Sequence, residues 1–189
     1  MVVFALTRWP DVMPDNFSAA YGLAFCAGVY FPKRLGWWLP LTVLLVTDIL
    51  KNIFQYHTAA VSPYMLFNYV SYAAIIWLGR RVSARASWLK LVGGGLLGAV
   101  LFYLLTNTSA WLQDPGYAKT LAGWIQALTQ GLPGFPHTWE FFRNSLLSGG
   151  LFTGLFAGAM KLNEAAEAAE EDETEPEPVE ETEPEQSQA

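Results

Sequence analysis

Residues 88–107 read WLKLVGGGLLGAVLFYLLTN, an apolar run that contains one charged side chain. A helix over this run would be about 30 Å long, which matches the hydrocarbon thickness of a bilayer. A soluble helical bundle is the alternative, but its helices need a polar face that repeats every 3.6 residues. This run has no such face, because apolar or small residues lie on every side. We therefore interpret the chain as a membrane protein.

Five further apolar segments lie between connections rich in proline, glycine or charge, near residues 16–31, 35–50, 63–79, 117–132 and 142–161. The pattern predicts an all-α, polytopic membrane helical bundle of about six transmembrane segments over residues 1–163. The segment at 16–31 is short, and the segment at 117–132 contains Lys119, Gln126 and Gln130. These two segments could be tilted, packed inside the bundle or partly re-entrant.

The C-terminal part of the chain has a different composition. Residues 164–189 hold 12 of the 17 acidic residues and no lysine, arginine or aromatic residue. Such a segment buries too little apolar surface to offset its ordering entropy, so we expect a disordered acidic tail, with helix to about Glu170. The tail would aid solubility or, alternatively, dock a basic partner. The net charge of −6 belongs to this tail, and we expect no nucleic-acid partner.

Residues that could carry catalysis or bind a metal are few. The chain has one cysteine, Cys26, and two distant histidines, His57 and His137. No zinc-ligand spacing, phosphate-binding glycine loop or nucleophile elbow is present in the sequence. We expect a protein that is not an enzyme, with no catalytic residue, no metal site and no cofactor.

Small residues recur at four-residue spacing in three segments. Close approach over small residues gives membrane helices dispersion contacts that hydrophobicity does not supply in lipid. These stripes either pack inside one bundle or bind another membrane subunit, and the sequence leaves both readings open. The candidate partner-binding residues are Ala20, Ala24, Gly28, Gly150, Gly154 and Gly158, and a shorter stripe is formed by Gly94 and Gly98.

Basic residues are distributed unevenly among the connections. Two connections hold Lys33 and Arg34, and Arg80, Arg81, Arg85 and Lys90, whereas the alternate connections hold only Lys51. The excess of lysine and arginine in cytoplasmic connections would place the arginine-rich side in the cytoplasm. With six spans both termini would face outward, and with five spans the acidic tail would be cytoplasmic.

Asp48 lies in the apolar run LPLTVLLVTDILKNIF, at residues 39–54. A central carboxylate costs about 2.5 to 3.5 kcal/mol on insertion into a membrane helix. Lys51 and Asn52 follow at i+3 and i+4, so one reading is a helix-end pair with either residue. The other reading is a polar anchor in a ligand cavity.

Further polar groups support the cavity reading. Tyr64, Asn68 and Tyr72 share one helical face, and other polar groups fall at the ends of the fourth segment and the start of the sixth. We predict a small-molecule site formed by Asp48, Asn68, Tyr72, Asn107, Trp111 and Asn144. Alternatively, these groups bond one another or backbone carbonyls and only fix helix packing.

Several short runs together resemble a family of small bacterial membrane proteins of unknown function. These runs are PDNFSAAYGLAFCAGVYF, LPLTVLLVTDILKN, TNTSAW, YAKTLAG and FFRNSLLSGGLF, within residues 14–160. The stretch LTQGLPGFPHTWE departs from that pattern and looks like an insertion. The resemblance implies a multi-pass protein of the bacterial inner, cytoplasmic membrane.

That family is similar in turn to the S components of energy-coupling-factor transporters, which are six-helix, substrate-binding membrane subunits. Ala20 and Ala24 match the Ala-x-x-x-Ala motif with which S components dock on a coupling membrane subunit. The similarity implies the substrate-binding subunit of a small-molecule uptake system, with the bilayer, a coupling protein and a small-molecule ligand as partners. The alternative is a structural or assembly membrane protein that binds other subunits through its small-residue helix faces.

Overall fold

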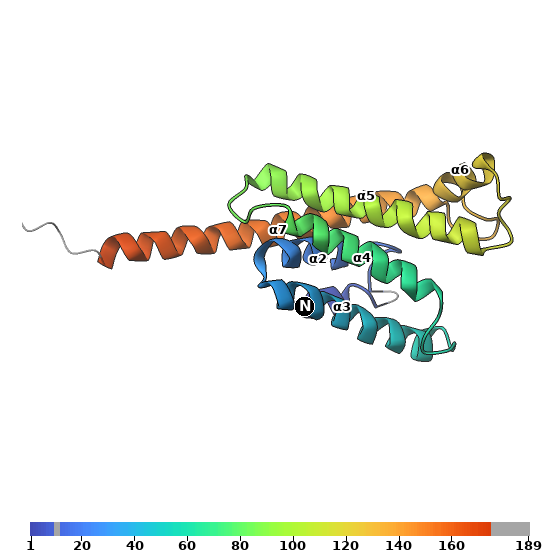
Figure 1. Ribbon diagram of the computed structural model, residues 1–189, viewed down its shortest axis with the longest axis horizontal. Helices are drawn as coiled ribbons and strands as arrows, with labels where there is room; N and C mark the ends of the chain where they lie inside the picture. Colours follow the sequence, from blue (N-terminus) through green and yellow to red (C-terminus); the bar gives the residue numbers. More distant parts are fainter. Residues whose placement is uncertain (10–11, 175–189) are drawn as a thin grey trace, which may run out of the picture. The chain divides into compact units, whose positions relative to one another are not determined.

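The protein is all-α in the computed structural model, which describes residues 1–9 and 12–174 (Figure 1). Seven α-helices and one π-helical turn occur there, and no strand occurs within those ranges. Residues 1–158 form one compact unit, and residues 159–189 form a second. In chain order the elements are α1 (Val2–Leu6), α2 (Ala20–Tyr30), α3 (Lys33–Leu50), η1 (Lys51–Gln55), α4 (Tyr64–Arg80), α5 (Trp88–Gln113), α6 (Leu121–Thr129) and α7 (Thr138–Thr174).

Among the described residues, three helical stretches are long and apolar enough to cross a membrane, namely Lys33–Gln55, Trp88–Gln113 and Thr138–Glu170. Each predicted segment contains a helix, but the prediction of six spans is not confirmed. Helix α2 has 11 residues and is about 16 Å long, whereas α5 has 26 residues and is about 39 Å long. Helix α6 has only nine residues. The sequence analysis also did not predict α1.

Helix α2 lies at the centre of the first unit, which explains why it is apolar all round. Eight of its eleven residues are buried, and α3, α4 and α5 all contact it. A helix that is apolar on every face suits either a lipid surrounding or enclosure by other helices, and α2 is enclosed. Because α2 is short, it fills only part of the length of its neighbours. Tyr21, at its start, packs against Tyr72 and Phe102, which lie near the middle of α4 and α5.

Glycines let the helices approach α2 to backbone contact. A Cβ atom on Gly28 would meet the Ile76 carbonyl oxygen of α4, and one on Gly79 would meet the Phe25 carbonyl oxygen of α2. Gly22 lies against the Thr153 backbone of α7 in the same way. Side chains at these positions would separate the helices, so the crossings depend on glycine.

The predicted partner-binding stripes pack inside the chain. Ala20 and Ala24 are fully buried, so neither is exposed to a partner in this structure. On α7, Leu96 covers Gly150, and Trp88 lies against both Gly154 and Gly158. The Trp88 indole N–H also donates a hydrogen bond to the Gly154 carbonyl oxygen at 3.2 Å. Both α2 and α7 thus use their small residues for contacts within the bundle.

The bundle has two chemically different ends. The basic end holds the α2–α3 and α4–α5 connections, where the Arg80 side chain of α4 donates to the carbonyl oxygens of Pro32 and Lys33 at 3.2 and 2.7 Å. The Asp48 end is the opposite one, where α3 finishes and α4 begins.

Helix α6 stays at the Asp48 end, next to the last turns of α5. The Trp124 indole N–H donates to the Thr108 hydroxyl at 2.9 Å, and the Tyr103 hydroxyl donates to the Leu128 carbonyl oxygen. Residues 117–132 are therefore not confirmed as a span, because the helix that they contain has nine residues and lies against the end of α5. The lysine of this segment, Lys119, donates to the carbonyl oxygens of Trp111 and Asp114.

Helix α7 starts at the Asp48 end and runs antiparallel to α5 (Figure 1). The Phe142 ring lies 4.6 Å from that of Tyr103, late in α5, whereas Gly154 packs against Trp88, at the start of α5. The compact unit ends at Gly158, so the chain leaves it at the basic end.

The acidic tail was predicted to begin at residue 164, with helix to about Glu170. Helix α7 continues to Thr174. The remaining tail, residues 175–189, lies outside the described residues, so its disorder stays a prediction.

The glycine crossing between α2 and α4 generates a stability prediction. Gly79→Ala should cost about 1–3 kcal/mol, because its methyl group would push against the Phe25 carbonyl oxygen of α2. Gly93→Ala is the matched control, since no atom lies within 4 Å of its added Cβ and alanine favours helix by up to about 1 kcal/mol. Thermal unfolding in detergent should show a lower midpoint for Gly79→Ala only. Equal midpoints for the two variants would contradict the close crossing.

Candidate functional site around Arg8 and Asp48

Two hydroxyl groups attach the end of α1 to the start of α2. The Thr7 hydroxyl donates to the Val3 carbonyl oxygen at 2.8 Å and accepts from the Ala19 amide at 2.9 Å. The Ser18 hydroxyl accepts from the Ala20 amide at 3.1 Å. These hydroxyls satisfy amide groups that a helix start leaves without partners. They also fix the position of the next residue, Arg8.

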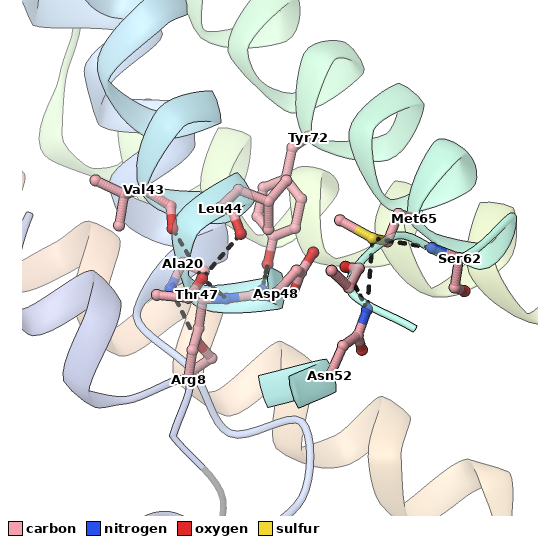
Figure 2. A network of polar contacts seen from close by, with 12 residues as sticks. Arg8, Ala20, Val43, Leu44, Thr47, Asp48, Asn52, Ser62, Met65 and Tyr72 are labelled. Carbon is pink, nitrogen blue, oxygen red and sulfur yellow. Dashed lines mark hydrogen bonds and ion pairs between the residues drawn. The ribbon is translucent and has the colours of Figure 1, made fainter. Parts of the chain in front are cut away.

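Arg8 binds three side chains with its guanidinium group (Figure 2). Its Nη2 donates to Asp48 Oδ1 in an ion pair, its Nε donates to the Thr47 hydroxyl at 3.1 Å, and its Nη1 donates to the Tyr72 hydroxyl at 3.2 Å. The side chains of Arg8 and Asp48 are only 10% and 8% exposed. A planar guanidinium suits this arrangement because it presents several N–H donors in fixed directions.

This geometry corrects the helix-end reading of Asp48. Asp48 pairs with a residue 40 positions earlier, and neither Lys51 nor Asn52 bonds it. The Asn52 amide instead donates to the Ala60 carbonyl oxygen at 3.1 Å and contacts the Met65 sulfur at 3.6 Å. Asn52 therefore holds the connection between η1 and α4, and the Lys51 ammonium lies 5.6 Å from the centre of the Tyr56 ring.

The ion pair is incompletely bonded. Burial alone would lower the pKa of Arg8, but the neighbouring Tyr72 and Asp48 outweigh burial and raise it above its ordinary value. The second carboxylate oxygen, Asp48 Oδ2, is buried and accepts no hydrogen bond from the described residues. A buried oxygen of this kind costs free energy unless a donor reaches it.

A cavity of about 330 Å³ lies beside the pair, in the part of the bundle that the short α2 does not fill. Its walls come from the segment after α1, the start of α2, the end of α3 with η1, α4 and α5. The lining residues are Thr7, Arg8, Trp9, Met13, Pro14, Asp15, Asn16, Phe17, Ser18, Tyr21, Asp48, Lys51, Tyr56, Asn68, Phe102 and Thr106. This volume lies within the range of small-molecule sites in proteins.

The cavity contains two of the six residues predicted to bind a ligand, Asp48 and Asn68. Tyr72 lies behind it and contributes through its hydrogen bond from Arg8. The other three bond backbone groups, as the packing alternative proposed. Asn107 donates to the Tyr103 carbonyl oxygen at 2.8 Å and Trp111 to that of Ala118 at 2.9 Å.

Asn144 has an indirect relation to the cavity. Its amide donates to the Asp15 carbonyl oxygen at 2.9 Å, which attaches the lining segment 13–18 to α7. Within that segment Asn16 adopts a left-handed conformation at φ 58°, which asparagine tolerates better than most residues.

The sequence analysis missed Arg8 and the lining segment 13–18. One signal was present for Arg8: it is the only basic residue before Lys33, and Asp48 is the only acidic residue between positions 16 and 113. Two isolated opposite charges in apolar surroundings are expected to pair. No comparable sequence signal marks segment 13–18, which lies at the cavity because of the path that its backbone takes.

The cavity offers an acceptor, donors and aromatic walls to one ligand. Asp48 Oδ2 is free to accept, while Lys51 and Asn68 can donate. The four charged residues of the lining, Arg8, Lys51, Asp15 and Asp48, balance to zero formal charge. Within the part of the chain that the structure describes, no three metal-ligating side chains cluster.

The buried pair generates a second stability prediction. Arg8→Met alone should destabilise the protein by about 3 kcal/mol, because it leaves the Asp48 carboxylate buried without its cation. The double variant Arg8→Met with Asp48→Leu should recover most of this loss, since an apolar pair needs no hydrogen bonds. Unfolding in detergent, combined as a double-mutant cycle, measures the coupling. Additive effects of the two substitutions would contradict a direct interaction.

Comparison with known proteins gives one family match. No curated protein matches the chain, and no solved structure does. The family model that matches covers residues 1–171, which include every helix of the compact unit and the whole cavity lining. The chain therefore belongs to this family, which is described as a family of unknown function, DUF6580.

Proposed function

We propose that this chain is a membrane protein that binds a small solute, as the substrate-binding subunit of an uptake system does. The observation that carries the proposal is the unpartnered oxygen of Asp48 beside a polar cavity, inside a bundle whose other buried side chains are mostly apolar. Ionisable groups inside membrane bundles are costly and commonly serve function. A ligand that donates to Asp48 Oδ2 would supply its missing hydrogen bond.

The cavity walls define the ligand chemistry. The ligand carries an N–H or O–H donor for Asp48 and an acceptor within reach of Lys51 or Asn68. It is uncharged or zwitterionic, because the charges of the lining cancel and a net charge would be buried without compensation. Tyr21, Tyr56 and Phe102 provide aromatic surface against which a ring of the ligand packs.

A protein that works as S components do would need a separate coupling subunit. This sequence contains no phosphate-binding glycine loop with which to drive transport itself. The positions of Ala20 and Ala24 do not support docking through these residues, since both are fully buried. Ala24→Trp would therefore report on folding rather than on docking. The alternative of an assembly protein has less support than solute binding, because its small-residue faces already pack within the bundle.

We further propose that the cavity opens away from the cytoplasm. Lysine and arginine concentrate in cytoplasmic connections of membrane proteins, and the basic end holds Lys33, Arg34, Arg80, Arg81 and Arg85. The Asp48 end then faces the outside of a bacterial cytoplasmic membrane. Because α6 folds back and α7 returns along α5, the chain leaves the bundle on the cytoplasmic side.

Ligand binding is tested by replacing two asparagines, one that lines the cavity and one that does not. Asn68→Leu should abolish retention of a co-purifying small molecule, because Asn68 lines the cavity. Asn107→Leu is the matched control, because its amide bonds a carbonyl of its own helix outside the cavity. Native mass spectrometry of the protein, purified gently from its own membrane, should show the adduct in the wild type and in Asn107→Leu only.

Two outcomes would count against solute binding. One is a wild-type protein that carries no small molecule under these conditions and gains no thermal stability with any member of a panel of neutral, ring-containing solutes. The other is an adduct that survives Asn68→Leu and Lys51→Gln unchanged, which would place the molecule elsewhere.

Orientation is tested by cysteine labelling. In a Cys26→Ala background, a cysteine at Asn16 should react with a membrane-impermeant maleimide in intact cells. A cysteine at Arg85 should react only after the membrane is opened, because it lies in the basic connection between α4 and α5. The reverse pattern would show that the cavity faces the cytoplasm.

A further inference from the structure

An apolar groove rimmed by cations runs along the first turns of α3, at the basic end. Its volume is about 420 Å³, and it is lined by Lys33, Arg34, Trp37, Trp38 and Leu41. The spacing i, i+1, i+4, i+5 and i+8 places these side chains along one face of the helix. Trp38 is 71% exposed, an unusual state for tryptophan in water but a normal one at a membrane interface.

The cations of this groove have no protein partner. Within residues 1–9 and 12–174, neither the Lys33 nor the Arg34 side chain forms an ion pair or a hydrogen bond. Nearby basic residues are engaged differently. Arg80 bonds two carbonyl oxygens, and the Arg81 guanidinium lies 4.5 Å from the centre of the Trp77 ring. Two exposed cations are thus left at the open end of an apolar groove.

We infer that this groove binds an anionic phospholipid of the surrounding leaflet. The phosphate group lies against Lys33 and Arg34, where the first amides of α3 add a partial positive charge. One acyl chain follows Trp37, Trp38 and Leu41, over about 12 Å of helix from Lys33 to Leu41. A free phosphate would use only the rim, whereas a phospholipid matches both the charge and the apolar floor.

This site is separate from the Asp48 cavity and does not depend on the solute that the cavity takes. Its lining shares no residue with that cavity, and the two lie at opposite ends of the bundle. Lipid in the groove would cover the exposed indole of Trp38 and anchor the start of α3. Arg80 fixes the same turn from the other side through the carbonyl oxygens of Pro32 and Lys33.

The experiment titrates phosphatidylglycerol or phosphatidylcholine with identical acyl chains into the full chain in detergent, and native mass spectrometry counts the adducts. The wild type should retain phosphatidylglycerol preferentially. Lys33→Gln with Arg34→Gln should lower that preference about tenfold or more, because each basic side chain near an anionic surface contributes roughly fivefold. Trp38→Ala should weaken the binding of both lipids and keep the preference between them.

Arg85→Gln with Lys90→Gln is the matched control, because it removes the same charge from the same end outside the groove. It should change the preference by less than about threefold, as expected for distant exposed charges. Equal losses in the two double variants would overturn the site in favour of a diffuse attraction. Absence of a preference in the wild type would overturn it outright. Displacement of the lipid by millimolar inorganic phosphate would show an anion site without a lipid.

Discussion

The ion pair between Arg8 and Asp48 is the interaction on which the rest of this structure depends. In a low-dielectric bundle neither charge is tolerated alone, so each requires the other. The pair attaches the N-terminal segment to α3, and Thr47 and Tyr72 complete the bonding of the guanidinium. It leaves one buried carboxylate oxygen without a donor, on a residue that also lines the cavity. The same interaction thus holds the fold together and creates the polar feature of the site.

The length of α2 explains why the cavity lies beside that pair. A central helix as long as α5 would fill the bundle from end to end, whereas α2 covers less than half of that length. Beyond the start of α2, towards the Asp48 end, its place is taken by the segment after α1, which the hydroxyls of Thr7 and Ser18 attach. Along α2 itself, Gly22 and Gly28, together with Gly79 of α4, allow neighbouring helices to cross closely. Tight packing near the basic end and incomplete filling near the Asp48 end follow from one short helix.

The sequence predicted much of the fold because apolar segments of this length are strong signals. It did not predict the site well, for physical reasons that particular residues show. Arg8 and Asp48 are 40 positions apart, and no helical periodicity relates them. Asn68 and Asn107 each lie in an apolar helix, and only the tertiary structure shows that one faces the cavity while the other bonds its own helix. Small-residue spacing likewise predicts close packing but does not reveal which helix is the neighbour.

The antiparallel course of α5 and α7 also connects the charge distribution of the chain to its orientation. Helix α6 begins and ends at the Asp48 end, so α7 brings the chain back to the basic end. Most of the acidic residues follow this point in the sequence, after Gly158. This carries no conflict with a cytoplasmic basic end, because the orientation of membrane helices follows lysine and arginine, and acidic residues contribute little. The overall charge of −6 therefore conceals a body, residues 1–163, that holds 11 basic and only 5 acidic side chains.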